Sequence, residues 1–200
     1  MSQYQLKPGD YLMLSDSLDD IGRTMERIEA GQTTLDGTGP VTPLPSGVMP
    51  CHSARVVADP SGNLCVAEMT APEFVITPVA EWMASNITTD SVWVLPLSEP
   101  LNGDQITDLW NWACDREGDL YDVLLLAEMA VTRRPAFYHH GVCSTSVALS
   151  MIVTNQPFSC PPQWYTPADL MALPYWQQPP ILYQALSADV ATTRLRSRKQ

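Results

Sequence analysis

The pattern of hydrophobic and polar positions predicts six short strands. Each stretch is short, apolar and rich in branched residues, and turn residues bound it, as is typical of β-strands. The stretches are GDYLMLSD (9–16), CHSARVVAD (51–59), NLCVAEMT (63–70), EFVI (73–76), SVWVLPL (91–97) and, as a last candidate, ILYQAL (181–186). The turn signal PSGN lies between the second and third stretches, so these two are expected to form a β-hairpin.

Apolar residues at helical spacing predict six helices, most of them in the second half of the chain. The expected ranges are 17–31, 77–84, 103–118, 122–131, 143–153 and 166–173. Ser17 is the expected N-cap of the first helix and Gly31 its stop, and Gly118 ends the third. Thr77 and Thr166 each precede a proline, which favours a helix start with proline at the first position.

The order of these elements indicates the fold class. A strand and a helix come first, then mainly strands, then mainly helices, and this segregation predicts an α+β fold with an antiparallel sheet. Residues 32–50 are rich in Gly and Pro and have no apolar period, so they predict a long irregular loop. Loops of this length inside a domain are often lids or binding loops.

Length and composition suit one domain. The 200 residues are 45% hydrophobic, which is enough for one full core. We predict a single domain over residues 1–186, with a core from about 7 to 153 and a C-terminal extension over 154–186. Residues 187–200 are expected to form a flexible basic tail, because the chain ends in RLRSRKQ.

Charge and cysteine usage exclude several classes of partner. The net charge of −11 argues against nucleic acid or an anionic membrane surface, since either favours a basic face. The start MSQYQLKPGDYLML predicts neither a signal peptide nor a transmembrane helix, so synthesis in the cytoplasm is expected. Five cysteines without a CxxC pair favour reduced thiols over disulfides or a zinc site. No metal or cofactor is expected.

Cys143 is the cysteine with the strongest case for chemistry. It lies at the predicted start of the helix CSTSVALSMIV, where unpaired amides and the helix dipole favour a thiolate and can hold an oxyanion. The small residues after it would let a substrate approach closely. An ordinary buried core cysteine explains this stretch equally well, because free cysteine is among the most buried residue types.

A nucleophilic cysteine needs a base, and three histidines are available. His139 and His140 lie in the approach to Cys143, where nothing fixes their orientation. His52 is the better candidate. If residues 59–63 make the turn, position 58 pairs with 64 and 52 with 70, and a one-step tighter pairing sets 52 opposite 68. In both registers His52 and Glu68 share one face of the hairpin. Glu68 could then orient the imidazole as the third member of a triad. The alternative is that both are ordinary polar residues of a strand.

These motifs together resemble the circularly permuted papain-like proteins of the NlpC-type peptidase superfamily. They are LKPGDYLMLSD, CHSARVVAD, VAEMT, EGDLYD (117–122) and GVCSTSVALSMI, and they cover about residues 7–153. YiiX/YaeF-like amidases are the most similar subgroup, and lecithin:retinol acyltransferase is a more distant relative. The order of His52, Glu68 and Cys143 is the permuted order of that group.

The resemblance implies Cys143 as nucleophile, His52 as general base and acid, Glu68 as orienter, and residues 118–122 as a wall near the cysteine helix. It implies a cysteine hydrolase that cleaves an amide bond in a peptide, expected in murein stem peptides. Departures from the family pattern are the Pro-rich loop at 32–50 and the residues after Asn155, for which no counterpart can be placed.

Two other functions remain open. An acyltransferase or lipid-ester hydrolase of the same fold would need an apolar groove, which the aromatic stretches LWNW and PPQWYTPADLMALPYW could line. A non-enzymatic assembly module, such as a virion or tail component of a phage, would not need the triad. Because murein lies outside the cytoplasm, the leading hypothesis requires a phage particle or another device that delivers the chain to the cell wall.

Overall fold

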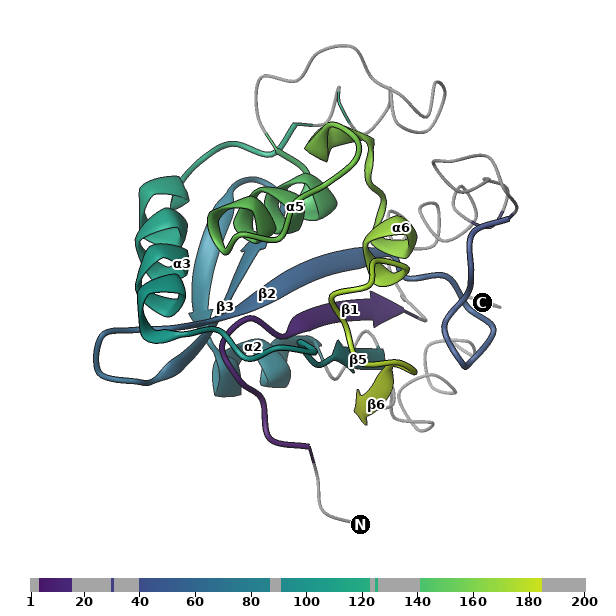
Figure 1. Cartoon of the computed structure of the whole chain (residues 1–200), viewed down its shortest axis with the longest axis horizontal. Coiled ribbons are helices and arrows are strands. Elements are labelled where there is room, and N and C mark those ends of the chain that lie inside the picture. Colours follow the sequence, from purple (N-terminus) through teal and green to yellow (C-terminus); the bar gives the residue numbers. More distant parts are fainter. Residues whose placement is uncertain are drawn as a thin grey trace, which may run out of the picture.

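The structure is a computed structural model that describes residues 4–15, 30, 40–86, 91–122, 125 and 141–184 (Figure 1). In chain order the strands are β1 (Tyr11–Ser15), β2 (His52–Ala58), β3 (Leu64–Met69), β4 (Phe74–Pro78), β5 (Ser91–Leu95) and β6 (Ile181–Gln184). The helices are α2 (Val79–Asn86), α3 (Gly103–Arg116), α5 (Cys143–Val153), the 3-10 helix η1 (Pro162–Trp164) and α6 (Pro167–Met171).

All six strands form one sheet in the order β4-β3-β2-β1-β5-β6, and every neighbouring pair is antiparallel. In the β2–β3 hairpin Ala58 pairs with Leu64, which is the first of the two registers that the sequence allows. The Asp59 carboxylate closes the turn by accepting hydrogen bonds from the amides of Ser61 and Asn63, at 2.8 and 2.9 Å. This side chain therefore stabilises the turn of the hairpin that carries His52 and Glu68.

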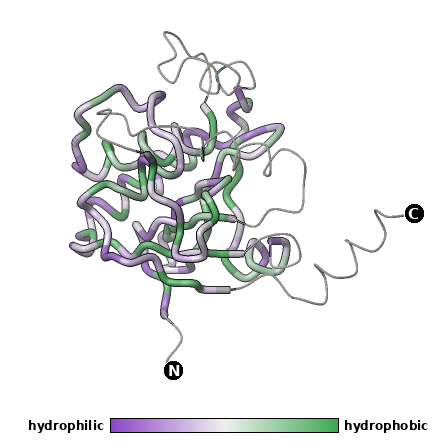
Figure 2. Tube along the Cα trace, turned by 90° about the vertical axis from the view of Figure 1, so that its right-hand side faces the viewer, coloured by the Kyte–Doolittle hydropathy of each residue, from purple (hydrophilic) through white to green (hydrophobic). Residues whose placement is uncertain are grey.

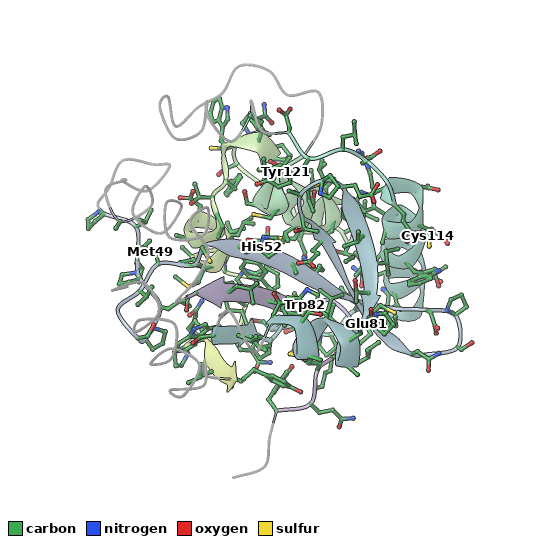
Figure 3. All side chains as sticks on the ribbon, turned by 180° about the vertical axis from the view of Figure 1, so that it is seen from behind. Met49, His52, Glu81, Trp82, Cys114 and Tyr121 are labelled. Carbon is green, nitrogen blue, oxygen red and sulfur yellow. The ribbon has the colours of Figure 1, made fainter. Side chains whose placement is uncertain are left out.

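Both faces of the sheet are covered. Along β1, Tyr11 and Met13 pack with α5 and α6, whereas Leu12 and Leu14 pack on the other face with Trp82 of α2. Figure 1 shows α5 and α6 in front of the sheet, and Figure 3 shows Trp82 from behind. Strands buried on two sides need apolar residues at successive positions, which explains why the strands are continuous apolar runs. Figure 2 shows hydrophobic and hydrophilic stretches alternating along the described trace.

Helix α3 packs against the β2–β4 end of the sheet through Leu109 and Ala113, both fully buried. Asn102 caps its start in a capping box with Gln105. Gly118 follows the end of α3 with a φ of +87°, a left-handed conformation that favours glycine. The predicted helix stop at Gly118 is confirmed, and the chain turns there toward the candidate site.

One predicted helix start is wrong. Thr77 and Pro78 were expected to cap and begin a helix, but they end β4, and α2 begins at Val79. Pro78 pairs with Cys65 of β3. Because β4 is an edge strand, its proline needs no amide hydrogen for a further neighbour, so pairing with β3 extends the strand over it.

The other predicted elements divide into those observed and those outside the described residues. The strand over 181–184 and the helix over 143–153 are confirmed, and α6 begins at Pro167 after the expected Thr166 cap but ends at Met171 rather than 173. The helices predicted over 17–31 and 122–131 lie outside the described residues except for Ala30, Asp122 and Leu125, and only 40–50 of the long loop are described. Among the helices that the structure describes, none combines the length and apolarity needed to cross a membrane.

Candidate active site

His52 and Glu68 lie together at the end of the hairpin opposite its turn. His52 is the first residue of β2, and Glu68 is one residue from the end of β3. Nε2 of His52 and Oε2 of Glu68 are 2.6 Å apart, and the two side chains are 19% and 11% exposed. Because an ionised carboxylate only accepts hydrogen bonds, Nε2–H of His52 donates to Glu68. The other ring nitrogen, Nδ1, is left for a second partner.

Cys143 begins helix α5 and is 6% exposed. The N-cap residue Val142 offers no side-chain hydrogen bond, and the amide of Ser146 is the one that donates to the carbonyl of Val142, at 3.0 Å. The amides before Ser146 therefore have no partner within the helix. Unpaired amides at this end of a helix stabilise negative charge nearby, so this backbone suits a thiolate or an oxyanion.

Cys143 and Glu68 both act on the imidazole of His52. Burial lowers the pKa of His52, but the charge of Cys143, a hydrogen bond to Cys143 and the interaction with Glu68 raise it well above its usual value. A histidine in this setting favours the imidazolium form at neutral pH, with Cys143 on one side and Glu68 on the other. The structure thus brings together all three residues that the sequence singles out.

We expect Glu68→Gln to lower the pKa of His52. The amide keeps a hydrogen-bond acceptor for Nε2–H but removes the negative charge that favours the imidazolium, so His52 loses its proton at a lower pH. NMR titration of the histidine ring signals measures this shift, with His52→Gln used to assign the signal. Glu81→Gln on the exposed surface of α2 is the control. Identical titration of His52 in both variants would remove Glu68 from the site.

Residues 118–122 pass beside the start of α5. Tyr121 forms a parallel bridge with Gly141, two residues before Cys143, and the amide of Asp122 donates to the carbonyl of Gly141 at 3.0 Å. Burial and then the charge of Cys143 raise the pKa of Tyr121.

The other four cysteines have free thiols and lie in different surroundings. Cys51 is buried and donates to the carbonyl of Leu14, Cys65 and Cys160 are half-buried, and Cys114 is exposed. Burial raises the pKa of Cys65 and Cys114, and nearby acidic residues raise it further. His139 and His140, the weaker candidates for the base, lie outside the described residues.

Arg55 is a buried residue that links the candidate site to the body of the fold. Its side chain is 1% exposed, stacks over Trp176 at 5.2 Å and donates to Oε1 of Gln156 at 3.0 Å. Burial lowers its pKa to about 9, against the opposing charge of Asp10. Gln156 lies just after the end of α5. Strand β2 therefore carries His52 at its start and, three residues later, Arg55, which contacts the chain at the far end of the helix that begins with Cys143. In the sequence, the only sign of this role is that Arg55 is a single charged residue within an apolar stretch.

Comparison with known proteins finds similarity at the level of the fold. No protein-family model matches the chain, and no curated protein matches it. Among solved structures, the chain is similar to the metalloprotein YiiX from Escherichia coli O157:H7, with a TM-score of 0.50 and 16% identity over 76% of this chain and 67% of that one. The chain therefore has an α+β fold like that of YiiX.

YiiX is described as a metalloprotein. The described part of this chain has no comparable set of metal-binding side chains. Within that part, no group of three or more His, Cys, Asp or Glu side chains is placed to hold a metal ion. The residues present thus do not fit a metal centre in the regions that the structure describes.

Proposed function

We propose that this chain is a cysteine hydrolase in which Cys143 is the nucleophile, His52 the general base and acid, and Glu68 the residue that orients His52. The observation that supports this most is the position of His52 between a carboxylate 2.6 Å away and the charge of Cys143. A histidine held on both sides in this way is the arrangement that activates a thiol and later returns a proton. Membership of the permuted papain-like family is part of this proposal, and the fold shared with YiiX supports it.

The reaction follows from these roles. The thiolate of Cys143 attacks the carbonyl carbon, a sulfur–carbon bond forms, and the carbonyl electron pair moves onto oxygen. The amides at the start of α5 are positioned to stabilise this oxyanion. When the intermediate collapses, the carbon–nitrogen bond breaks and the amine leaves with the proton of the His52 imidazolium. Water, deprotonated by His52, then attacks the thioester and releases a carboxylic acid and the thiol.

A peptide amide is the preferred substrate class. The alternative, a lipid-ester hydrolase or acyltransferase, would require exposed aromatic residues lining a groove. Instead Tyr165 and Trp176 are buried in the core beneath α5, and Trp110 and Trp112 pack against the core beside α3. Tyr175 does line a pocket, but that pocket lies at Thr154–Gln156, beyond the end of α5 opposite to Cys143. We further propose that the amide lies in a murein stem peptide and that a phage particle or another device delivers the chain to the cell wall, as the family resemblance implies.

Competitive alkylation tests the proposal without knowledge of the substrate. We expect limiting iodoacetamide at neutral pH to modify Cys143 before Cys114, although Cys143 is 6% exposed and Cys114 is exposed. A thiolate paired with His52 reacts faster than a protonated thiol. Peptide mapping by mass spectrometry gives the rate at each cysteine. Labelling that follows exposure, with Cys114 first and Cys143 last, would instead favour a non-enzymatic assembly module.

A further inference from the structure

A pocket of about 250 Å³ lies at the end of α5 that is remote from Cys143. It is lined by Thr154–Gln156, which directly follow the helix, by residues 97–101 and 174–175, and by Gln105 of α3. Because an α-helix rises 1.5 Å per residue, the 11 residues of α5 separate this pocket from Cys143 by roughly 16 Å. The pocket is therefore distinct from the candidate active site.

The backbone at the end of α5 fixes the position of Gln156. The amide of Asn155 donates to the carbonyl of Ile152 at 3.0 Å, and the amide of Gln156 donates to that of Met151 at 2.8 Å. Asn155 has a φ of +60°, so these bonds form the Schellman motif that ends many helices on a left-handed residue. The side chain of Gln156 thus starts from a backbone that the fold holds in place.

One half of the Gln156 side-chain amide is used by the protein. The residue is 8% exposed, and its Oε1 accepts hydrogen bonds from Arg55 at 3.0 Å and from the hydroxyl of Thr154 at 3.2 Å. Among the residues that the structure describes, its Nε2 has no hydrogen-bond partner, although Gln156 lines the pocket. Because an unpaired donor this deeply buried costs free energy, the pocket favours a ligand that brings an acceptor oxygen.

Charge around the pocket favours a cation as well. Glu99 is exposed, and it is the charged residue among the described residues that line the pocket, whereas the buried guanidinium of Arg55 does not line it. The C-terminal end of α5, which also lies here, carries the negative end of the helix dipole. Leu97, Leu101 and Pro174 add apolar surface. A ligand that fits has an ammonium group, a neutral carbonyl oxygen and an apolar side chain.

We infer that this pocket binds the N-terminal residue of a peptide, with its α-ammonium group at Glu99 and its first carbonyl oxygen accepting from Nε2 of Gln156. An amino-terminal residue carries both groups on one carbon, with the side chain as the third substituent. The volume lies below the roughly 300–1,000 Å³ of pockets for drug-sized ligands, which suits a ligand of one residue. The inference stands independently of the proposed function, because none of Cys143, His52 and Glu68 lines this pocket.

Titration with L-leucinamide, followed by two-dimensional amide NMR, tests the inference. We expect the side-chain amide signals of Gln156 and the backbone signal of Glu99 to shift as the ligand binds. Gln156→Met removes the donor and should bind at least about tenfold more weakly, the scale of one buried hydrogen bond. Because Gln156→Met also removes the acceptor for Arg55, Gln156→Glu is the second variant. It keeps that acceptor, cannot donate to a carbonyl, and should also bind more weakly than the wild type.

A second ligand and a matched pair of variants test the role of charge. N-acetyl-L-leucinamide has no ammonium group and should bind the wild type more weakly than L-leucinamide does. Glu99→Gln should weaken L-leucinamide by about threefold, the scale of an exposed ion pair, and leave the acetylated ligand unchanged. Glu81→Gln, on α2 and away from the pocket, is the control and should change neither affinity.

The possible results separate this inference from its alternatives. Signals of Gln156 that do not move with L-leucinamide at millimolar concentrations overturn it. Unchanged affinity in both Gln156 variants also overturns it, since the ligand would then bind elsewhere. Equal affinity for the two ligands in the wild type overturns the assignment to a peptide N-terminus. The iodoacetamide reactivity of Cys143, measured on the same variants, judges the proposed function separately.

Discussion

Cys143→Ser is expected to reduce the acylation rate by p-nitrophenyl acetate by roughly three orders of magnitude or more, and Cys143→Ala to abolish it. Serine keeps the size of the residue, but its hydroxyl is far less acidic than a thiol, so the neighbouring imidazole cannot hold it as an anion. Removal of a nucleophile commonly costs this much or more in enzymes that form an acyl intermediate. Release of nitrophenolate, measured under single-turnover conditions, gives the rate.

The matched control for this prediction is Cys51→Ala, at the other cysteine that is buried. Its sulfur donates to the carbonyl of Leu14, in the cluster that packs with Trp82. We expect this variant to lose about 1–3 kcal/mol of stability and to keep its acylation rate. Cys65, Cys114 and Cys160 should likewise tolerate alanine. If one of these four variants lost acylation while Cys143→Ala kept it, the nucleophile would be another cysteine.

His52→Ala is expected to lower the acylation rate by roughly two to four orders of magnitude, the scale of a positioned base. Without the imidazolium, Cys143 loses its counter-charge, and a buried carboxylate at Glu68 loses its 2.6 Å partner. Because that orphaned carboxylate could also destabilise the fold, His52→Gln is the second variant. Its amide can still donate to Glu68 but cannot serve as a base, so the loss of rate should persist while stability recovers.

The two other histidines provide the contrast. His139→Ala and His140→Ala are expected to change the acylation rate little, because His52 already serves as the base and Glu68 already orients it. A large loss in either variant, with His52→Ala close to the wild type, would move the base to the segment before Cys143. That ranking would also contradict the resemblance to the permuted family.

Local rules predict the part of the site that lies on the hairpin. An Asp-Pro-Ser-Gly-Asn turn sets the pairing of Ala58 with Leu64, and the two-residue period of a strand then decides that His52 and Glu68 share a face. The start of α5 at Cys143 follows from the apolar run after it. These features depend on neighbours in sequence, so they can be derived before the structure is known.

Contacts between distant segments could not be derived in this way. Nothing near Arg55 in the sequence indicates that it reaches Gln156, 101 positions away, and β6 pairs with β5 only because the chain after α6 returns to that edge. The approach of Tyr121 to Cys143 depends on its bridge to Gly141. Such contacts are set by the packing of whole elements, which local patterns do not specify.

The central claim is that Cys143 carries the acyl group during catalysis. The most direct measurement is mass spectrometry of the protein quenched in acid shortly after mixing with p-nitrophenyl acetate, followed by peptide mapping. The account predicts the mass of one added acetyl group, located on Cys143 and absent from Cys143→Ala, and its loss at later times as water hydrolyses the thioester. Acetylation spread over lysines, with Cys143 unmodified at every time, would contradict it.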